Sequence, residues 1–97
     1  MKAVIDIGTN SVRFLRQVDG QLKEDVYYTR LGEDTHLDGM IKPDAYERTL
    51  SALKIALSEL NTDDILITAT SALREAKNRE AVLARFYQDL GREVTLL

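Results

Sequence analysis

The segment Ala3-Val-Ile-Asp-Ile-Gly-Thr-Asn-Ser-Val12 runs an apolar strand directly into a tight polar turn. Val4, Ile5 and Ile7 are β-branched residues, which favour a pleated strand that is covered on both faces. Asp6 interrupts them near the carboxyl end of the strand, where a carboxylate is costly to bury unless it has a partner. This order of residue types predicts a buried strand that ends in a functional turn.

The turn after this strand has the chemistry of an anion-binding loop. Gly8 permits a sharp bend of the backbone. Thr9, Asn10 and Ser11 then offer hydroxyls, an amide and successive backbone N–H groups to a phosphate or to the water shell of a metal ion. Short strings of this kind also occur in ordinary turns, so these residues alone leave a plain turn as the alternative.

The composition indicates one domain and excludes several classes of protein. Ninety-seven residues, of which 44% are hydrophobic, suffice for one modest core. Thirteen basic and sixteen acidic residues give a net charge of −3, which argues against a nucleic-acid binder or a membrane-surface protein. The chain has no cysteine for thiolate metal sites, and its single histidine, His36, cannot build a histidine-rich zinc site. With no long apolar run and no signal peptide, we expect a cytoplasmic protein.

A hairpin and a loop are predicted next along the chain. Residues 11–18 and 21–28 are extended runs on either side of Asp19-Gly20, a dipeptide favoured where both turn residues need positive φ. Residues 31–43 contain glycines and a proline among polar neighbours, which predicts a loop. Apolar residues then recur at steps of three and four, which predicts a helix over residues 44–60. The stripe of this helix consists of Tyr46, Leu50, Leu53, Leu57 and Leu60.

The second half of the chain repeats the pattern of strand and helix. Residues 65–69 form a short apolar run like residues 3–7, typical of a parallel sheet. Ser71 is a candidate N-cap for a short helix through Arg74, and Asn78 is a candidate N-cap for a second helix over residues 79–90. Gly91 would end that helix, and residues 93–97 are predicted as one more strand. The apolar stripe of the second helix consists of Val82, Leu83, Phe86 and Leu90.

These elements predict an α/β fold with a mixed five-stranded sheet in the order 3-2-1-4-5. Right-handed crossovers place residues 65–69 and 93–97 parallel to residues 3–7. Parallel strands end at the same edge of a sheet, so the turn after residue 7 and the turn after residue 69 should meet there. Two polar turns that are distant in the sequence would form one site.

The second turn supplies Thr70, Ser71 and Arg74. Hydroxyls and backbone N–H groups at a helix start bind anionic oxygens, and an arginine fork can bind two at once. The alternatives are a plain N-cap for Ser71 and a solvated helix charge for Arg74. These residue types together favour phosphate chemistry.

Four motifs that occur in order resemble the exopolyphosphatase and guanosine pentaphosphate phosphohydrolase family, also called Ppx/GppA phosphatases. The resemblance runs from about residue 2 to residue 97, and the combination is more specific than any single motif. The motifs are Ala3-Val-Ile-Asp-Ile-Gly-Thr-Asn-Ser-Val-Arg13, Arg30-Leu-Gly-Glu33, Glu47-Arg-Thr-Leu50 and Ala69-Thr-Ser-Ala-Leu-Arg74.

The resemblance implies a fold, a set of site residues and a cofactor. The fold would be half of an actin, sugar-kinase and Hsp70-like (ribonuclease H-like) domain, with residues 1–97 as the amino-terminal portion of a phosphatase domain. Asp6 would help to place Mg²⁺ through water, since oxygen ligands suit a metal that keeps much of its hydration shell. The residues implied to bind substrate are Gly8, Thr9, Asn10, Ser11, Arg30, Glu33, Ser71 and Arg74.

The sequence also departs from the family pattern. Lys42-Pro43 replaces the usual Ser-Pro helix start, which implies a weaker cap. Residues 34–37, Asp-Thr-His-Leu, depart from the commoner Gly-Val after Arg-Leu-Gly-Glu, and His36 is expected to be a surface loop residue. The resemblance places the second phosphate loop and the general-base carboxylate beyond Leu97, so we expect no catalytic residue within these residues and no activity from them alone.

The implied function is release of terminal phosphate from polyphosphate or guanosine pentaphosphate by a magnesium-dependent hydrolase. A non-catalytic phosphate- or nucleotide-binding module, or an inactive fragment, is the alternative. A kinase of the same fold is the second alternative, because the first phosphate loop does not separate kinases from hydrolases, although the turn over residues 70–74 favours the hydrolase. We expect neither nucleic acid nor membrane as a partner, and we expect self-association through the exposed sheet edge near Leu97.

Overall fold

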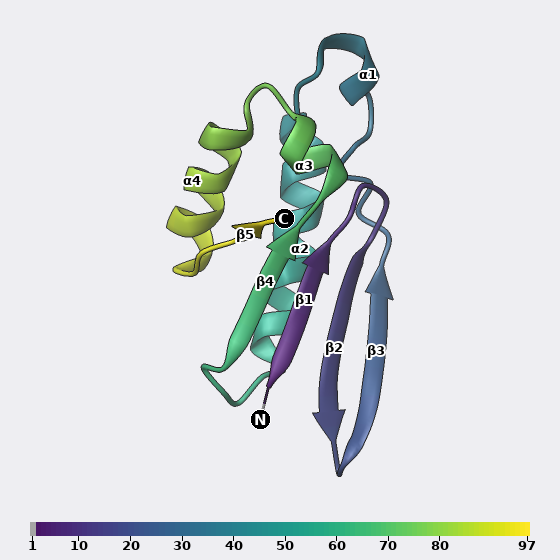
Figure 1. Ribbon diagram of the computed structural model, residues 1–97, viewed down its shortest axis with the longest axis vertical. Coiled ribbons are helices and arrows are strands. Elements are labelled where there is room, and N and C mark those ends of the chain that lie inside the picture. The colour runs from purple at the N-terminus through teal and green to yellow at the C-terminus, as the bar shows by residue number, and fades with distance from the viewer. Residues whose placement is uncertain (1) are drawn as a thin grey trace.

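Five strands form one mixed sheet in the order β3-β2-β1-β4-β5 in the computed structural model, which describes residues 2–97. β1 pairs antiparallel with β2 and parallel with β4, and β4 pairs parallel with β5 (Figure 1). The predicted strand order and pairing are therefore confirmed. The strands are β1 Ala3–Ile7, β2 Val12–Val18, β3 Gln21–Tyr27, β4 Ile65–Ala69 and β5 Thr95–Leu96.

The hairpin between β2 and β3 turns at the predicted dipeptide. Asp19 has a φ of 52° and Gly20 a φ of 80°, so both turn residues are left-handed. This turn matches the right-handed twist of the flanking strands. The register pairs Val18 with Gln21 and carries the strands back to Val12 opposite Tyr27. As a result, the start of β2 lies beside the end of β3 and both lie close to the turn that follows β1.

The two long helices pack on one face of the sheet. They are α2 (Pro43–Ser58), which passes behind β1 and β4 in Figure 1, and α4 (Arg79–Leu90), which lies beside it. Ring centroids of Tyr46 and Phe86 lie 4.7 Å apart and join the two helices. Each helix has a period-3.6 apolar stripe, and burial of that stripe supplies most of its stability. The largest fully buried apolar side chains are Phe14, Phe86, Ile5, Ile7, Leu31, Leu53, Leu73 and Val12.

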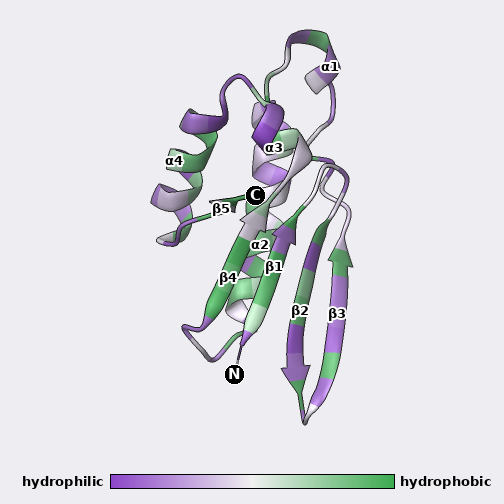
Figure 2. Ribbon diagram, viewed as in Figure 1, coloured by the Kyte–Doolittle hydropathy of each residue, from purple (hydrophilic) through white to green (hydrophobic). Residues whose placement is uncertain are grey.

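The opposite face of the sheet has no helix over it within residues 2–97 (Figure 1). Alternation along the strands directs Val4, Leu15 and Leu66 to this face, and Leu66 is half exposed. Figure 2 shows that β1 and β4 are apolar along most of their length, whereas β2 and β3 alternate with polar residues. The central strands thus have the composition of strands that are covered on both faces.

Three local predictions need correction. The predicted loop over residues 31–43 contains a one-turn helix, α1 (Thr35–Asp38). The residues that flank this helix, Asp34 and Gly39, both have the left-handed conformation. The first long helix ends at Ser58 rather than at residue 60, and the last strand covers only Thr95–Leu96. None of the helices in residues 2–97 is long and apolar enough to cross a membrane.

The predicted side-chain caps are wrong. The short helix α3 (Ser71–Glu75) has Thr70 at its N-cap position, and Ser71 is already its first helical residue. Asn78 does occupy the N-cap position of α4, but its side chain hydrogen-bonds the backbone N–H (2.9 Å) and C=O (3.1 Å) of Ile41 instead of the helix. Tertiary contacts have therefore replaced the local hydrogen bonds that capping propensity predicts.

Candidate functional site

One backbone hydrogen bond joins the starts of the turns that follow β1 and β4. The backbone N–H of Thr70 donates to the carbonyl of Ile7 at 3.2 Å, continuing the parallel pairing of Ile7 with Ala69. Gly8 therefore follows β1 at the place where Thr70 follows β4. The prediction that two polar turns meet at the carboxyl ends of β1 and β4, hereafter the carboxyl edge, is confirmed at the level of the backbone.

The first turn, residues 8–11, closes on itself. Gly8 N–H donates to the carbonyl of Ser11 at 2.9 Å, and a Cβ at position 8 would lie 3.1 Å from that same oxygen. Glycine thus allows the turn to close tightly. The closed turn places Thr9 and Asn10 at its tip, with Asn10 exposed and Thr9 half-buried. The polar groups of Thr9 and Asn10 therefore lie at the carboxyl edge, where a ligand can reach Asn10.

Asp6 lies two residues before Gly8, on the sheet face opposite α2. Its Oδ1 accepts a hydrogen bond from the Thr68 hydroxyl at 3.0 Å, and the register pairs these two residues directly across β1 and β4. The partner explains how a half-buried carboxylate is tolerated in an apolar strand. Residues 2–97 contain no cluster of three or more acidic or histidine side chains able to hold a metal ion.

A third segment, residues 29–33, packs against the first turn. Arg30 N–H donates to the carbonyl of Asn10 at 3.1 Å, and Gly32 N–H donates to that of Thr9 at 3.0 Å. Arg30 has a φ of 50°, a conformation that is uncommon outside glycine and that needs support from its surroundings. The carboxylate of Glu33 pairs with Arg48 of α2 at 2.5 Å. The family resemblance implies that Arg30 and Glu33 bind substrate. Arg30 is exposed, whereas Glu33 is already paired with Arg48.

The second turn places Ser71 and Arg74 in different surroundings. Ser71 is exposed, and its φ of 23° is a strained value for a residue with a side chain. Arg74 is exposed, and its Nη1 donates to the carbonyl of Leu97 at 3.3 Å. Arg79 donates to the carbonyl of Arg74 at 2.7 Å, which ties the start of α4 to α3. The structure thus bonds Thr70, the residue before Ser71, to the end of β1 and directs the Arg74 guanidinium toward the residue after β5.

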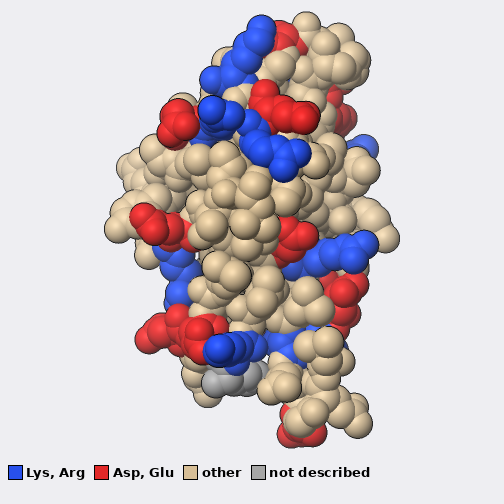
Figure 3. Space-filling view, viewed as in Figure 1, with Lys and Arg blue, Asp and Glu red and all other residues tan. Residues whose placement is uncertain are grey.

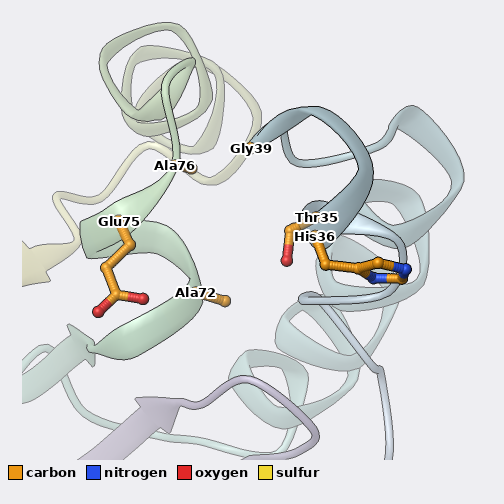
Figure 4. A pocket seen from close by; sticks show the side chains of 6 residues that line it. All are labelled: Thr35, His36, Gly39, Ala72, Glu75 and Ala76. Atoms are coloured by element: carbon orange, nitrogen blue, oxygen red, sulfur yellow. The ribbon is translucent and has the colours of Figure 1, made fainter.

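A cavity of about 260 Å³ opens next to this edge, between α1 and α3 (Figure 4). Small residues form much of its wall, namely Gly39, Ala72 and Ala76. The side chains of His36 and Glu75 also border it but point away from each other. His36 is exposed, as expected for a surface loop residue. In Figure 3, basic and acidic side chains mix over this end of the molecule, so no single charge dominates the face shown.

Two residues that sequence reasoning did not select belong to this region. Thr68 binds Asp6, and only the strand register, which places residue 6 opposite residue 68, could have indicated it. Arg48 binds the segment over residues 29–33. It lies in the motif Glu47-Arg-Thr-Leu50, which supports the family resemblance but does not by itself indicate what Arg48 contacts. Thr68 and Arg48 both hydrogen-bond other residues of the protein, and residue type alone does not predict such contacts.

Comparison with known proteins gives consistent matches. The Ppx/GppA phosphatase family matches residues 15–97. A bifunctional 3-dehydroquinate synthase/phosphatase of Fusobacterium nucleatum is 31% identical over 92% of this chain and 16% of its own length. The crystal structure of the Aquifex aeolicus Ppx/GppA family member superposes with a TM-score of 0.80 at 33% identity, covering 98% of this chain and 34% of that one. An exopolyphosphatase from Cytophaga hutchinsonii superposes with a TM-score of 0.84 at 26% identity, covering 98% and 33%. The chain therefore spans about a third of these solved structures.

Proposed function

This chain belongs to the Ppx/GppA phosphatase family, and on that basis we propose that it forms the phosphate-binding part of a phosphohydrolase. The sheet order and helix placement match solved family members, whose fold is actin-like. The reaction would release the terminal phosphate of a chain of phosphoanhydrides such as polyphosphate or guanosine pentaphosphate. Because the chain spans 34% of the Aquifex protein, the activity is proposed for a protein that contains these residues.

One observation carries this proposal: the hydrogen bond of 3.2 Å between Thr70 and Ile7 that joins the two polar turns. It puts the N–H groups and hydroxyls of the first turn beside the start of α3. Ligands of open α/β sheets bind at the carboxyl ends of parallel strands, where such turns are exposed. Backbone N–H groups in successive turns suit the oxygens of a phosphate.

The residues at this edge would bind and orient phosphate. Thr9, Asn10 and Ser11 would donate hydrogen bonds to phosphate oxygens, and Ser71 would do so from the second turn. The Arg74 fork would neutralise charge that develops as water attacks phosphorus in line with the leaving oxygen. To do this, Arg74 must give up its hydrogen bond to the Leu97 carbonyl. The phosphate oxygen that would replace this neutral carbonyl is charged and is therefore a stronger acceptor.

Mg²⁺ is implied by the family resemblance, and the side chains at the edge fit it. The Asp6 carboxylate and the Thr68 hydroxyl lie 3.0 Å apart and supply oxygen atoms, the ligand type that a hard cation prefers. Asp6 would hold the ion through water, with Thr68 fixing the direction of the carboxylate. When bound, Mg²⁺ supplies positive charge that offsets the charge of the phosphate oxygens.

A non-catalytic phosphate-binding module is the second candidate, and the carboxylates at the edge favour it for this chain alone. Glu33 is paired with Arg48, and Asp6, which Thr68 orients through Oδ1, is assigned above to the water shell of Mg²⁺. A general base has to reach the proton of the attacking water. The base of the proposed hydrolase would come from outside residues 2–97.

The proposal is tested by ³¹P NMR of tripolyphosphate and of guanosine 5′-triphosphate titrated with the chain, with and without Mg²⁺. Saturable broadening of the phosphate resonances with both ligands, strengthened by Mg²⁺, supports a phosphate site of the proposed kind. Broadening by the nucleotide alone would indicate a nucleotide module instead. Absence of broadening at millimolar chain would contradict both candidates.

A further inference from the structure

Arg48 of α2 binds the loop over residues 29–33 at several atoms. Its Nε donates to the carbonyl of Thr29 at 3.0 Å, and its Nη2 donates to the carbonyl of Arg30 at 3.3 Å. The same Nη2 pairs with the carboxylate of Glu33 at 2.5 Å. A planar guanidinium can hold these acceptors in one fixed geometry, which a lysine ammonium cannot reproduce. A single half-buried side chain thus fixes both ends of the loop.

The loop that Arg48 holds is itself bonded to the first turn. Arg30 and Gly32 donate their N–H groups to the carbonyls of Asn10 and Thr9, at 3.1 Å and 3.0 Å. The left-handed φ of Arg30 costs free energy for a residue with a Cβ, so the loop needs external contacts to keep this shape. Arg48 supplies a contact to the carbonyl of that same residue.

We infer that Arg48 is a positioning residue of the phosphate-binding edge, which sets the Thr9–Asn10 tip by holding the loop over residues 29–33 against it. This inference rests on the proposed function for its consequence in phosphate binding. The mechanical part, that Arg48 orders the loop, stands on the contacts alone. Glu33 then serves as an anchor of the loop rather than as a ligand of substrate.

Other arginines of the chain offer a matched control. Arg85 of α4 pairs with Glu47 at 2.8 Å and with Asp89 at 3.6 Å, and it stacks over the Tyr46 ring at 4.5 Å. It therefore links α2 and α4 by contacts of similar kind, but it touches no residue of the carboxyl edge. Loss of Arg85 should weaken the fold without moving the first turn.

Hydrogen exchange of single amides tests the mechanical part. Arg48→Met should speed exchange of the Arg30 and Gly32 amides about tenfold or more, since a lost charged hydrogen bond is worth at least that factor. Arg85→Met should leave both amides unchanged relative to the rest of the sheet, and Arg48→Lys should restore only part of the protection. Unchanged protection of the Arg30 and Gly32 amides in Arg48→Met would overturn the inference. If Arg48→Met does not fold, the same comparison is made with Arg48→Lys and Glu33→Gln, which keep most of the packing. Protection of the Arg30 and Gly32 amides that equals that of the unmodified chain in both variants would overturn the inference.

Tripolyphosphate binding tests the consequence and separates it from the proposed function. Arg48→Met should weaken binding several-fold more than Arg85→Met does. Equal weakening by the two variants would show that Arg48 contributes stability alone and would refute its positioning role. If the unmodified chain does not bind tripolyphosphate, the proposed function fails, while the exchange data still decide whether Arg48 orders the loop.

Discussion

Gly32 lies directly against Thr9, with its N–H bonded to the Thr9 carbonyl at 3.0 Å. A Cβ at position 32 would lie 2.5 Å from the Thr9 methyl and 3.4 Å from the Ala72 Cβ. Glycine here serves close packing, because three segments meet at this point: the first turn, the loop over residues 29–33 and the start of α3. Their spacing depends on the absence of one methyl group.

Gly32→Ala should therefore destabilise the fold by about 1–3 kcal/mol, the usual cost of overpacking a tight contact. Thr9→Ser removes the opposing methyl and keeps the hydroxyl, so the double variant should recover most of this loss. Urea unfolding of the two single variants and the double variant measures the coupling between the two positions. Additive losses would show that the two side chains do not compete for the same space.

Thr29 has a buried hydroxyl with no hydrogen-bond partner among residues 2–97. Thr29→Val replaces that hydroxyl with a methyl of similar size and should raise the free energy of unfolding by about 1 kcal/mol, because an unsatisfied buried polar group is costly. Thr49 is the matched control, since its hydroxyl donates to the Ala45 carbonyl at 2.9 Å. Thr49→Val should cost stability, and a loss of stability in Thr29→Val as well would show that the Thr29 hydroxyl is satisfied by water.

Burial and the 2.7 Å hydrogen bond to Asp89 raise the pKa of the Tyr46 hydroxyl above its ordinary value of 10.0. The folded state then holds this proton more tightly than the unfolded state does. The resulting stabilisation is complete below about pH 10 and is lost as the pH rises above that value. Tyr46→Phe should flatten the alkaline fall in the free energy of unfolding, compared with the unmodified chain from about pH 8 to about pH 11.

Some alkaline dependence should remain in Tyr46→Phe, because burial and the nearby Glu59 and Asp25 also raise the pKa of Tyr27. The phenylalanine ring keeps the contact with Phe86, so the loss of stability at neutral pH should be limited to the hydrogen bond between Tyr46 and Asp89. Identical pH profiles for the two proteins would contradict the assignment of the proton to Tyr46.

The chain alone is expected to release no phosphate from tripolyphosphate in the presence of Mg²⁺. Arg48 pairs with Glu33, and the Asp6 carboxylate that Thr68 orients is assigned to the water shell of Mg²⁺, so neither carboxylate is assigned to take a proton from the attacking water. A colorimetric phosphate assay over long incubation measures this. Phosphate release that Asp6→Ala abolishes would contradict the expectation and show that these residues suffice for catalysis.

The backbone of this edge was predictable because periodicity and turn chemistry act locally. The apolar run in residues 3–7 and the Asp19-Gly20 turn predict the pairing that the sheet shows. The predicted side-chain caps of Ser71 and Asn78 do not form. Local sequence could not show this for Asn78, because its side chain binds Ile41, which lies 37 residues away. Substrate choice, Mg²⁺ dependence, self-association and a cytoplasmic location stay predictions.

The central claim is that the turns after β1 and β4 together bind phosphate, and the most direct test is an amide chemical-shift titration with tripolyphosphate. Saturable shifts should be largest in residues 8–11 and 70–74, with smaller shifts at the Arg30 and Gly32 amides that are bonded to the first turn. Arg74→Ala should weaken this binding by about 1.5–3 kcal/mol, the scale of a charge-assisted hydrogen bond. Arg92→Ala should not weaken it, because Arg92 pairs with Asp63 before the start of β4, at the opposite end of that strand. Shifts that are absent from both turns, or equal loss of affinity in Arg74→Ala and Arg92→Ala, would contradict the claim.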